Sequence, residues 1–222
     1  MIVPTILTND PNEAKEKISF LKGKASRVQI DIIKQWFASP QTISPEDLMG
    51  AVSPEDSLFF DWHLMTADPV VYLDKDLPEP TGLVIGQIEM MTSQLEFVRR
   101  AKEEGYQAGL AIDLETPLKK LKLQALDFCD QVLVLAVRAG RGGQKFSPSC
   151  LSKIRELSSW RQKEGWDFQI AVDGGLNAKT IPSCFEAGAE VFCVGNSIWK
   201  AKNPGEKIKK LEGLLKNANR NE

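Results

Sequence analysis

The run QVLVLAVRAGRGGQKF, residues 131–146, decides the fold of this chain. It joins a continuously apolar segment, Gln131–Val137, to a glycine-rich loop. A strand that is apolar throughout is buried on both faces, as in parallel sheets that helices cover. A helix candidate follows at Ser149–Glu164 and ends at Gly165, a residue that commonly terminates helices. The next apolar run, Phe168–Val172, completes a strand–helix–strand unit.

The same alternation recurs along the whole chain. We predict strands at Ile2–Leu7, Arg27–Ile33, Ser57–Trp62, Gly82–Ile85, Gln107–Ile112, Gln131–Val137, Phe168–Val172 and Glu190–Val194. We predict helices at Asn12–Lys22, Thr92–Glu104, Ser149–Glu164, Asn177–Glu186 and Pro204–Lys216, with weaker ones after Pro45, Asp68 and Thr116. Eight strands alternating with about eight helices favour an α/β fold, a (β/α)8 TIM barrel that forms a single domain over residues 1–222. An open, doubly wound sheet is the alternative.

The composition is that of an ordinary soluble globular protein. The chain has 222 residues, a formal net charge of -2, 42% apolar residues and 26% charged residues. This balance argues against a nucleic-acid or membrane partner bound mainly by charge. Met1–Leu7 lacks the basic start of a signal peptide, and no stretch is apolar enough to span a bilayer. We therefore expect a cytoplasmic protein.

The cysteines indicate no metal centre. Cys129, Cys150, Cys184 and Cys193 form no C-x-x-C pair, and the chain has a single histidine. A zinc site of the Cys/His type needs more ligands at closer spacing, so we expect buried, reduced thiols.

Polar residues stand at several predicted strand ends, where a (β/α)8 barrel carries its active site. Asp31, His63 and Asp173 form one set, able to hold a divalent metal or to perform acid–base chemistry. Helix caps for the acids and a structural role for the histidine are the alternatives. Glycine-rich segments follow three successive strands and suit a phosphate: Gly142, Gly143, Gly174, Gly175 and Gly195, with Ser197 adjacent.

These residues carry a family resemblance: the chain resembles ribulose-phosphate 3-epimerases from end to end. The matching segments are Pro4-Thr5-Ile6-Leu7, Val28-Gln29-Ile30-Asp31-Ile32, Asp61-Trp62-His63-Leu64-Met65 with Pro69, Ala108-Gly109-Leu110-Ala111-Ile112 with Thr116-Pro117-Leu118, Gly140–Phe146, Val172-Asp173-Gly174-Gly175-Leu176, and Ala187-Gly188-Ala189 leading to Gly195-Asn196-Ser197. The G-x-G-G-Q-K-F and V-D-G-G segments, in this order, are quite specific.

The resemblance implies a barrel that interconverts D-ribulose 5-phosphate and D-xylulose 5-phosphate, a phosphorylated ketose being its partner. It implies that Asp31 and Asp173 exchange the C3 proton through an enediolate stabilised by a divalent metal (Zn, Fe(II), Mn or Co). Asp31, His63 and Asp173 match three metal ligands, and Gln29 stands at the fourth position. The residues expected to contact substrate or its phosphate are Thr5, Met65, Gly140, Gly142, Gly143, Gly174, Gly175, Gly195, Asn196 and Ser197. Dimers and larger assemblies occur in the family, which leaves a homo-oligomer open.

The chain departs from the family pattern on the side that meets the sugar and the metal. Gln29 replaces a histidine ligand, and an amide oxygen is a weak ligand for zinc-like metals. Gly86-Gln87 stand where a histidine usually follows the fourth strand, and Ile33-Lys34-Gln35 replace Met-Asp-Gly. Arg138 and Arg141 enter the phosphate loop. The three basic residues are either solvated loop charges or groups that meet an extra acidic group or replace the charge of the metal.

Three functions therefore remain open at this point. The retained Asp31/Asp173 pair favours an epimerase of phosphorylated ketoses. The change at Gln29 leaves open a non-catalytic phosphosugar-binding barrel, because a fold does not fix a function. A lyase or aldolase that acts on another sugar phosphate is the third.

Overall fold

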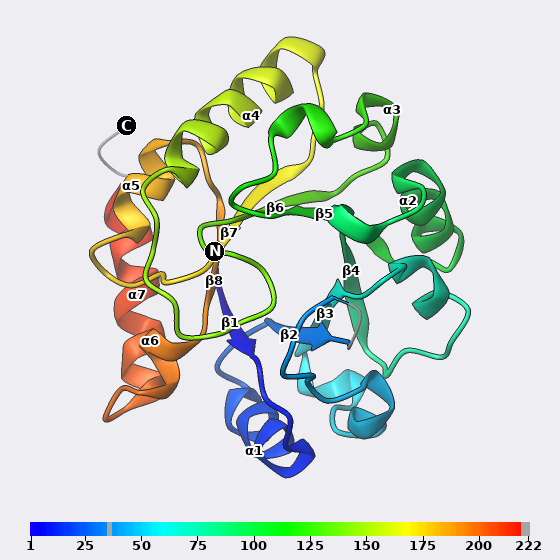
Figure 1. Cartoon of the computed structure of the whole chain (residues 1–222). Coiled ribbons are helices and arrows are strands. Elements are labelled where there is room, and N and C mark those ends of the chain that lie inside the picture. The colour runs from blue at the N-terminus through cyan, green and yellow to red at the C-terminus, as the bar shows by residue number, and fades with distance from the viewer. Residues whose placement is uncertain (35–36, 219–222) are drawn as a thin grey trace.

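The strands close into a parallel barrel in chain order, each hydrogen-bonded to its sequence neighbours and β8 to β1 (Figure 1). This computed structural model describes residues 1–34 and 37–218. In those ranges the barrel strands are β1 Ile2–Ile6, β2 Arg27–Ile33, β3 Phe59–Met65, β4 Thr81–Gln87, β5 Gln107–Ile112, β6 Gln131–Leu135, β7 Gln169–Asp173 and β8 Val191–Val194. The predicted (β/α)8 barrel is confirmed, and the open sheet is wrong.

Helices surround this barrel on the outside (Figure 1). The α-helices are α1 Pro11–Leu21, α2 Gln94–Glu103, α3 Leu123–Leu126, α4 Cys150–Glu164, α5 Ile181–Glu186, α6 Asn196–Trp199 and α7 Pro204–Ala218. Short 3₁₀ helices supplement them: η1 Pro45–Leu48, η2 Pro54–Asp56, η3 Pro69–Tyr72, η4 Ile88–Met90 and η5 Leu118–Lys120. Among the helices described, none is both long and apolar enough to cross a membrane.

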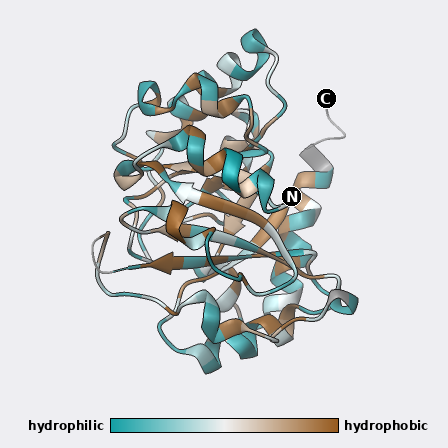
Figure 2. Ribbon diagram, turned by 90° about the vertical axis from the view of Figure 1, so that its right-hand side faces the viewer, coloured by the Kyte–Doolittle hydropathy of each residue, from teal (hydrophilic) through white to brown (hydrophobic). Residues whose placement is uncertain are grey.

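Side-chain alternation along the strands separates two apolar layers. The larger layer packs the outer faces of the strands against the helices, with Trp62, Phe97 and Phe192 fully buried there. A smaller cluster contains alternate strand residues such as Val3, Ile85 and Cys193, and it fills the interior of the barrel. In Figure 2 the apolar colour accordingly gathers on the strands, while the surrounding helices carry much of the hydrophilic colour.

The floor of the barrel, at the N-terminal ends of its strands, is polar. Arg27 Nε donates to both carboxylate oxygens of Asp61, at 3.1 and 2.8 Å. Arg27 Nη2 also donates to Gln131 Oε1 at 3.3 Å. Asp61 and Gln131 are both buried, so this network satisfies polar groups that would otherwise be costly inside the barrel. The candidate functional site lies at the opposite end of the barrel, at the C-terminal ends of the strands.

Several predicted strand boundaries differ: β4, predicted to end at Ile85, extends to Gln87, and two further differences concern the histidine and an acid of the site. The prediction ends the third strand at Trp62, but β3 continues to Met65, so His63 lies within the strand and faces the interior. The prediction ends the seventh strand at Val172, but β7 includes Asp173 as its last residue. Polar residues inside a barrel break the apolar run that marks a strand, which explains both early endings.

The weaker helices predicted after Pro45, Asp68 and Thr116 are single 3₁₀ turns, η1, η3 and η5, with a four-residue α3 after the last. Pro45 and Pro69 stand at the start of their turns, where proline is tolerated, and the next prolines, Pro54 and Pro78, limit how far a helix could extend. The helix predicted at Asn177–Glu186 begins only at Ile181. Before it, Thr180 Oγ1 accepts the backbone N–H of Asn177 at 2.9 Å and holds a turn.

Candidate active site

A pocket of about 500 Å³ opens at the C-terminal ends of the strands. Its lining includes every residue that the sequence predicts for the site except Gln29, which lies fully buried beneath it. The predicted residues that line it are Thr5, Asp31, His63, Met65, Gly140, Gly142, Gly143, Asp173, Gly174, Gly175, Gly195, Asn196 and Ser197. Residues from six of the eight strands or the loops after them thus converge, because parallel strands place all their C-terminal ends at one edge.

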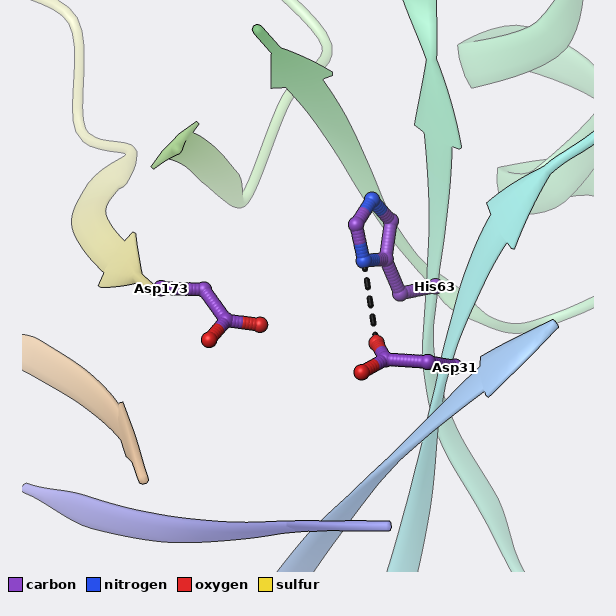
Figure 3. Close-up of side chains that lie close together, drawn as sticks. All are labelled: Asp31, His63 and Asp173. Atoms are coloured by element: carbon purple, nitrogen blue, oxygen red, sulfur yellow. Dashed lines mark hydrogen bonds and ion pairs between the residues drawn. The ribbon is translucent and has the colours of Figure 1, made fainter. Parts of the chain in front are cut away.

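Two acids and the histidine face one another in this pocket (Figure 3). Asp31 on β2 is directly opposite His63 on β3 in the strand register, and Oδ1 of Asp31 lies 3.1 Å from Nδ1 of His63. Asp173 projects from β7 on the other side of the barrel. One oxygen or nitrogen atom from each of the three lies within 4.8 Å of the others, close enough for a single metal ion to be shared.

Gln29 links the two acids from below. It precedes Asp31 by two residues on β2, so both side chains point to the barrel interior. Its Nε2 donates to Asp31 Oδ1 at 2.9 Å and to Asp173 Oδ2 at 2.8 Å. Its Oε1 is buried and has no hydrogen-bond partner within the described residues, a costly arrangement for an amide oxygen.

His63 is held on both sides of its ring. Its Nε2 lies 2.8 Å from Oε1 of Gln87, the last residue of β4. Gln87 Nε2 in turn donates to Glu89 Oε2 at 2.6 Å. Both His63 and Gln87 are buried, whereas Glu89 reaches the surface. A hydrogen-bonded chain therefore runs from Asp31 through the imidazole to an exposed carboxylate.

Burial and neighbouring charge set the acidities in the site. Burial raises the pKa of Asp173, and the charge of Asp31 raises that pKa further. Burial alone lowers the pKa of His63, but the hydrogen bond and charge of Asp31 more than offset this effect and raise it overall. A carboxyl group whose pKa is shifted toward neutrality is suited to take up and return a proton near pH 7.

The glycines of the pocket allow loops to approach closely. Gly175 has φ +66°, and a Cβ built there would lie 2.3 Å from the backbone nitrogen of Phe146. A Cβ on Gly195 would lie 2.7 Å from Thr5 Oγ1. Gln144 Nε2 donates to the carbonyls of Arg138 and Arg141, both at 2.7 Å, and so folds the loop after β6 upon itself. The three glycine segments thus form one wall of the pocket.

The basic residues noted in the sequence divide between two places. Arg138 and Arg141 are exposed and line the pocket. Lys34 turns away from it, because its Nζ donates to Ser44 Oγ at 2.6 Å in front of η1. Lys34 is not among the described residues that line the pocket. Gln35 lies outside the described residues.

Some pocket residues escaped the sequence analysis. Lys17 reaches the pocket from α1 and packs over the ring of Trp199, 5.3 Å from its centroid. Trp199 Nε1 donates to the carbonyl of Thr5 at 2.7 Å, which fixes the end of β1 beside the loop after β8. Gln87 was noted as a departure from the family pattern but without a role. Gln87 lies two residues after Ile85 on β4, so both side chains point to the same face of the strand. This alternation could have placed Gln87 inside the barrel.

Comparison with known proteins agrees with this geometry. The sequence pattern of the ribulose-phosphate 3 epimerase family matches residues 1–199. The chain is 32% identical to a ribulose-phosphate 3-epimerase of Schizosaccharomyces pombe, over 98% of this chain and 94% of the relative. It is 31% identical to the Bacillus subtilis enzyme of that name, over 96% and 98%. A rice relative, 29% identical over 95% and 92%, is named a cytoplasmic isoform.

Solved structures share the fold at low identity. KGPDC from Streptococcus mutans superposes with a TM-score of 0.70 at 13% identity, covering 97% of both chains. A 3-hexulose-6-phosphate synthase from Salmonella typhimurium gives 0.64 at 17% identity, covering 97% of this chain and 98% of that one. At such identities the likeness supports the barrel alone.

Proposed function

Because the chain belongs to the ribulose-phosphate 3-epimerase family, we propose that it inverts C3 of a phosphorylated ketose, interconverting D-ribulose 5-phosphate and D-xylulose 5-phosphate. The observation that carries this proposal is the pairing of Asp31 and Asp173, which project from opposite sides of the barrel toward one point. Inversion through a planar intermediate needs one proton carrier on each face, and two opposed carboxyl groups meet that need.

In the proposed reaction one carboxylate removes the proton from C3, and the other carboxyl group delivers a proton to the opposite face. The roles exchange in the reverse direction, so each acid must be able to hold a proton. Burial and the charge of Asp31 favour the protonated form of Asp173. Without a metal, Gln29 Nε2 donates to both carboxylates and keeps them oriented toward each other.

The donor set fits a divalent metal. Two carboxylates and an imidazole suit ions such as Zn, Fe(II), Mn or Co. The partnerless Oε1 of Gln29 is a fourth donor, because an amide turned the other way would direct this oxygen toward the carboxylates. That orientation is favourable only if a cation lies between them. When bound, the ion would stabilise the negative charge that develops on the ketose oxygens.

The phosphate of the substrate is proposed to lie against the glycine wall. Gly142, Gly143, Gly174, Gly175 and Gly195 offer backbone N–H groups without side chains in the way. The adjacent Ser197 and Asn196 add polar side chains, while Thr5, Met65 and Gly140 border the sugar. Arg138 and Arg141 give the pocket mouth positive charge, which favours an anionic ligand.

Two broader expectations complete the proposal. We place the reaction in the cytoplasm, in line with the name of the rice relative. We also take residues 1–222 as one catalytic unit, because the matched pattern starts at residue 1 and extends through β8 and α6.

The proposal is tested by following D-ribulose 5-phosphate with protein stripped of metal, before and after addition of Zn, Fe(II), Mn or Co. We expect turnover that depends on added metal and that the Asp31→Asn and Asp173→Asn variants lose. Absence of turnover with every metal would contradict the proposal and favour a non-catalytic phosphosugar-binding barrel. Cleavage of the sugar phosphate in place of epimerisation would favour a lyase.

A further inference from the structure

The orientation of the Gln87 amide follows from its two neighbours. Glu89 carries a carboxylate, which accepts hydrogen bonds but cannot donate, so the amide nitrogen of Gln87 must face it. The amide oxygen then faces His63, and it too can only accept. The ring nitrogen 2.8 Å away, Nε2, must therefore carry a proton.

The position of Glu89 is itself fixed. Its second oxygen, Oε1, accepts the backbone N–H of Asp113 at 2.8 Å, just beyond the end of β5. Lys153 Nζ holds the same segment by donating to the carbonyls of Asp113 and Leu114 at 2.6 and 2.9 Å. The carboxylate that orients Gln87 is thus itself held by the backbone just beyond the neighbouring strand β5.

We propose that Gln87 and Glu89 are positioning residues that keep His63 protonated at Nε2 and direct its Nδ1 at Asp31 and Asp173. This inference rests on the proposed function, because it assigns these residues to the same site. A histidine can bind a metal only through an unprotonated nitrogen. A proton fixed at Nε2 therefore leaves Nδ1 as the ring nitrogen that can bind the metal. Nδ1 is the ring nitrogen beside the Asp31 carboxylate.

Residues that hydrogen-bond to a metal-binding histidine affect how tightly the site binds its metal. Groups that orient a ligating histidine typically change metal affinity or activity by about 10–100-fold when they are removed. Gln87 is fully buried, so no water replaces it easily as an acceptor for Nε2. The arrangement thus explains why a buried glutamine and an acid reaching from the surface occupy the end of β4 and its exit.

The test uses the fact that His63 is the only histidine in the chain. Nitrogen-15 NMR of the imidazole in the full protein therefore reports this ring alone. In the metal-free protein we expect Nε2 to carry a proton, whether or not the protein turns over any sugar. In the zinc-loaded protein we expect a proton on Nε2 and none on Nδ1. An unprotonated Nε2 in either state would overturn the inference.

Zinc affinity provides the second readout, measured by competition with a chelator. We expect Gln87→Leu and Glu89→Ala to weaken zinc binding by about 10–100-fold and to alter the nitrogen signals of His63. Glu89→Gln has one oxygen for two donors, Gln87 Nε2 and the Asp113 N–H, so we expect a smaller loss of affinity than in Glu89→Ala. Wild-type affinity and unchanged signals in every one of the two variants Gln87→Leu and Glu89→Ala that folds would overturn the inference.

Gln131→Leu is the matched control, since it makes the same change inside the barrel but at its floor. We expect it to leave the signals of His63 unchanged. Glu89→Ala keeps the test decisive if Gln87→Leu fails to fold, because Glu89 is exposed. Failure to epimerise any ketose phosphate, with these signals as expected, would count against the proposed function alone.

Discussion

Replacement of Asp173 by asparagine removes a group that can carry a proton but keeps a side chain of nearly the same size and shape. Asp173 Oδ2 accepts a hydrogen bond from Gln29 Nε2 at 2.8 Å, and an asparagine oxygen can accept the same bond. The amide cannot take up a proton, so it removes one of the two proposed proton carriers. A positioned general acid or base typically contributes about 10²–10⁴-fold to the rate. This corresponds to roughly 2.7–5.5 kcal/mol of the barrier, and we expect Asp173→Asn to lose a factor of that size in kcat.

The variant keeps one acid, so it should still exchange the C3 hydrogen of one epimer with solvent, and this exchange can be measured. Asp31 still faces one side of the sugar, so Asp173→Asn should exchange the C3 hydrogen with deuterated water in only one of the two epimers. Asp31→Asn should show exchange in the other epimer. Proton NMR of D-ribulose 5-phosphate and D-xylulose 5-phosphate in deuterated water measures both. Exchange in the same epimer for both variants, or a rate for Asp173→Asn within tenfold of wild type, would refute the two-acid scheme.

Stability supplies an independent check on the same variant. Burial, with the charge of Asp31, raises the pKa of Asp173 above its value of about 4 in an unfolded chain. The folded protein then binds this proton more tightly than the unfolded chain, so stability is lost as pH rises from about 4 through the raised pKa. In the presence of a chelator, Asp173→Asn should therefore be at least as stable as wild type at pH 8, with a smaller advantage at pH 5.

The control for these measurements is Asp127→Asn on the outside of the barrel. Asp127 is exposed and accepts a hydrogen bond from Trp166 Nε1 at 2.7 Å, and neither residue lines the pocket. We expect it to leave the rate and its pH dependence unchanged. Thermal unfolding of metal-free Asp173→Asn at pH 8 at a lower temperature than wild type would show that the carboxylate stabilises the empty site, contrary to the charge argument.

Further predictions concern the metal and the glycine wall. A metal at 100 times its Kd should raise the free energy of unfolding by about 2.7 kcal/mol and Tm by roughly 5–10 °C; Asp31→Asn, which keeps His63 and Asp173 as donors, should reduce this increase in a thermal shift assay. Gln29→His should favour zinc over manganese in competition titrations, because imidazole suits zinc better than an amide oxygen does; an unchanged preference would show that residue 29 is not a ligand. Gly175→Ala places a Cβ 2.3 Å from the backbone of Phe146 at φ +66°. It should therefore raise KM and lower the free energy of unfolding in urea by more than about 1–2 kcal/mol. Gly213→Ala, with open space around it, should change neither KM nor stability in this direction.

The sequence predicts the barrel well because the signal is repeated. Each strand that is covered on both faces reads as an apolar run, and the runs recur at the spacing of strand–helix units. The convergence of Asp31, His63 and Asp173 follows from the same periodicity, since residues at the C-terminal ends of parallel strands share one edge. A residue's place on a strand is thus accessible from sequence when the strand itself is recognised.

The sequence does not predict which hydrogen-bond partner a polar side chain takes when several are within reach. Lys34 stands near Asp31 in the chain but bonds to Ser44, because the loop after β2 folds back over it. Nothing in the sequence tells which way the amides of Gln29 and Gln87 face, since that depends on carboxylates from other strands and loops. The length of β3 was missed for a related reason, because its inward residues are polar.

The two glutamines together suggest where this chain differs from its relatives. By resemblance, each stands where a histidine is expected, and each has its amide nitrogen turned to a carboxylate. The changes keep the hydrogen-bonded framework around both acids and the imidazole, so the acid pair survives. In the proposed metal site, Gln29 would supply an amide oxygen where the resemblance implies an imidazole nitrogen, beside two carboxylates and a single imidazole. Oxygen-rich sets favour harder ions such as manganese over zinc. We therefore expect metal preference, and not the fold or the pair of proton carriers, to be the property that these substitutions have altered.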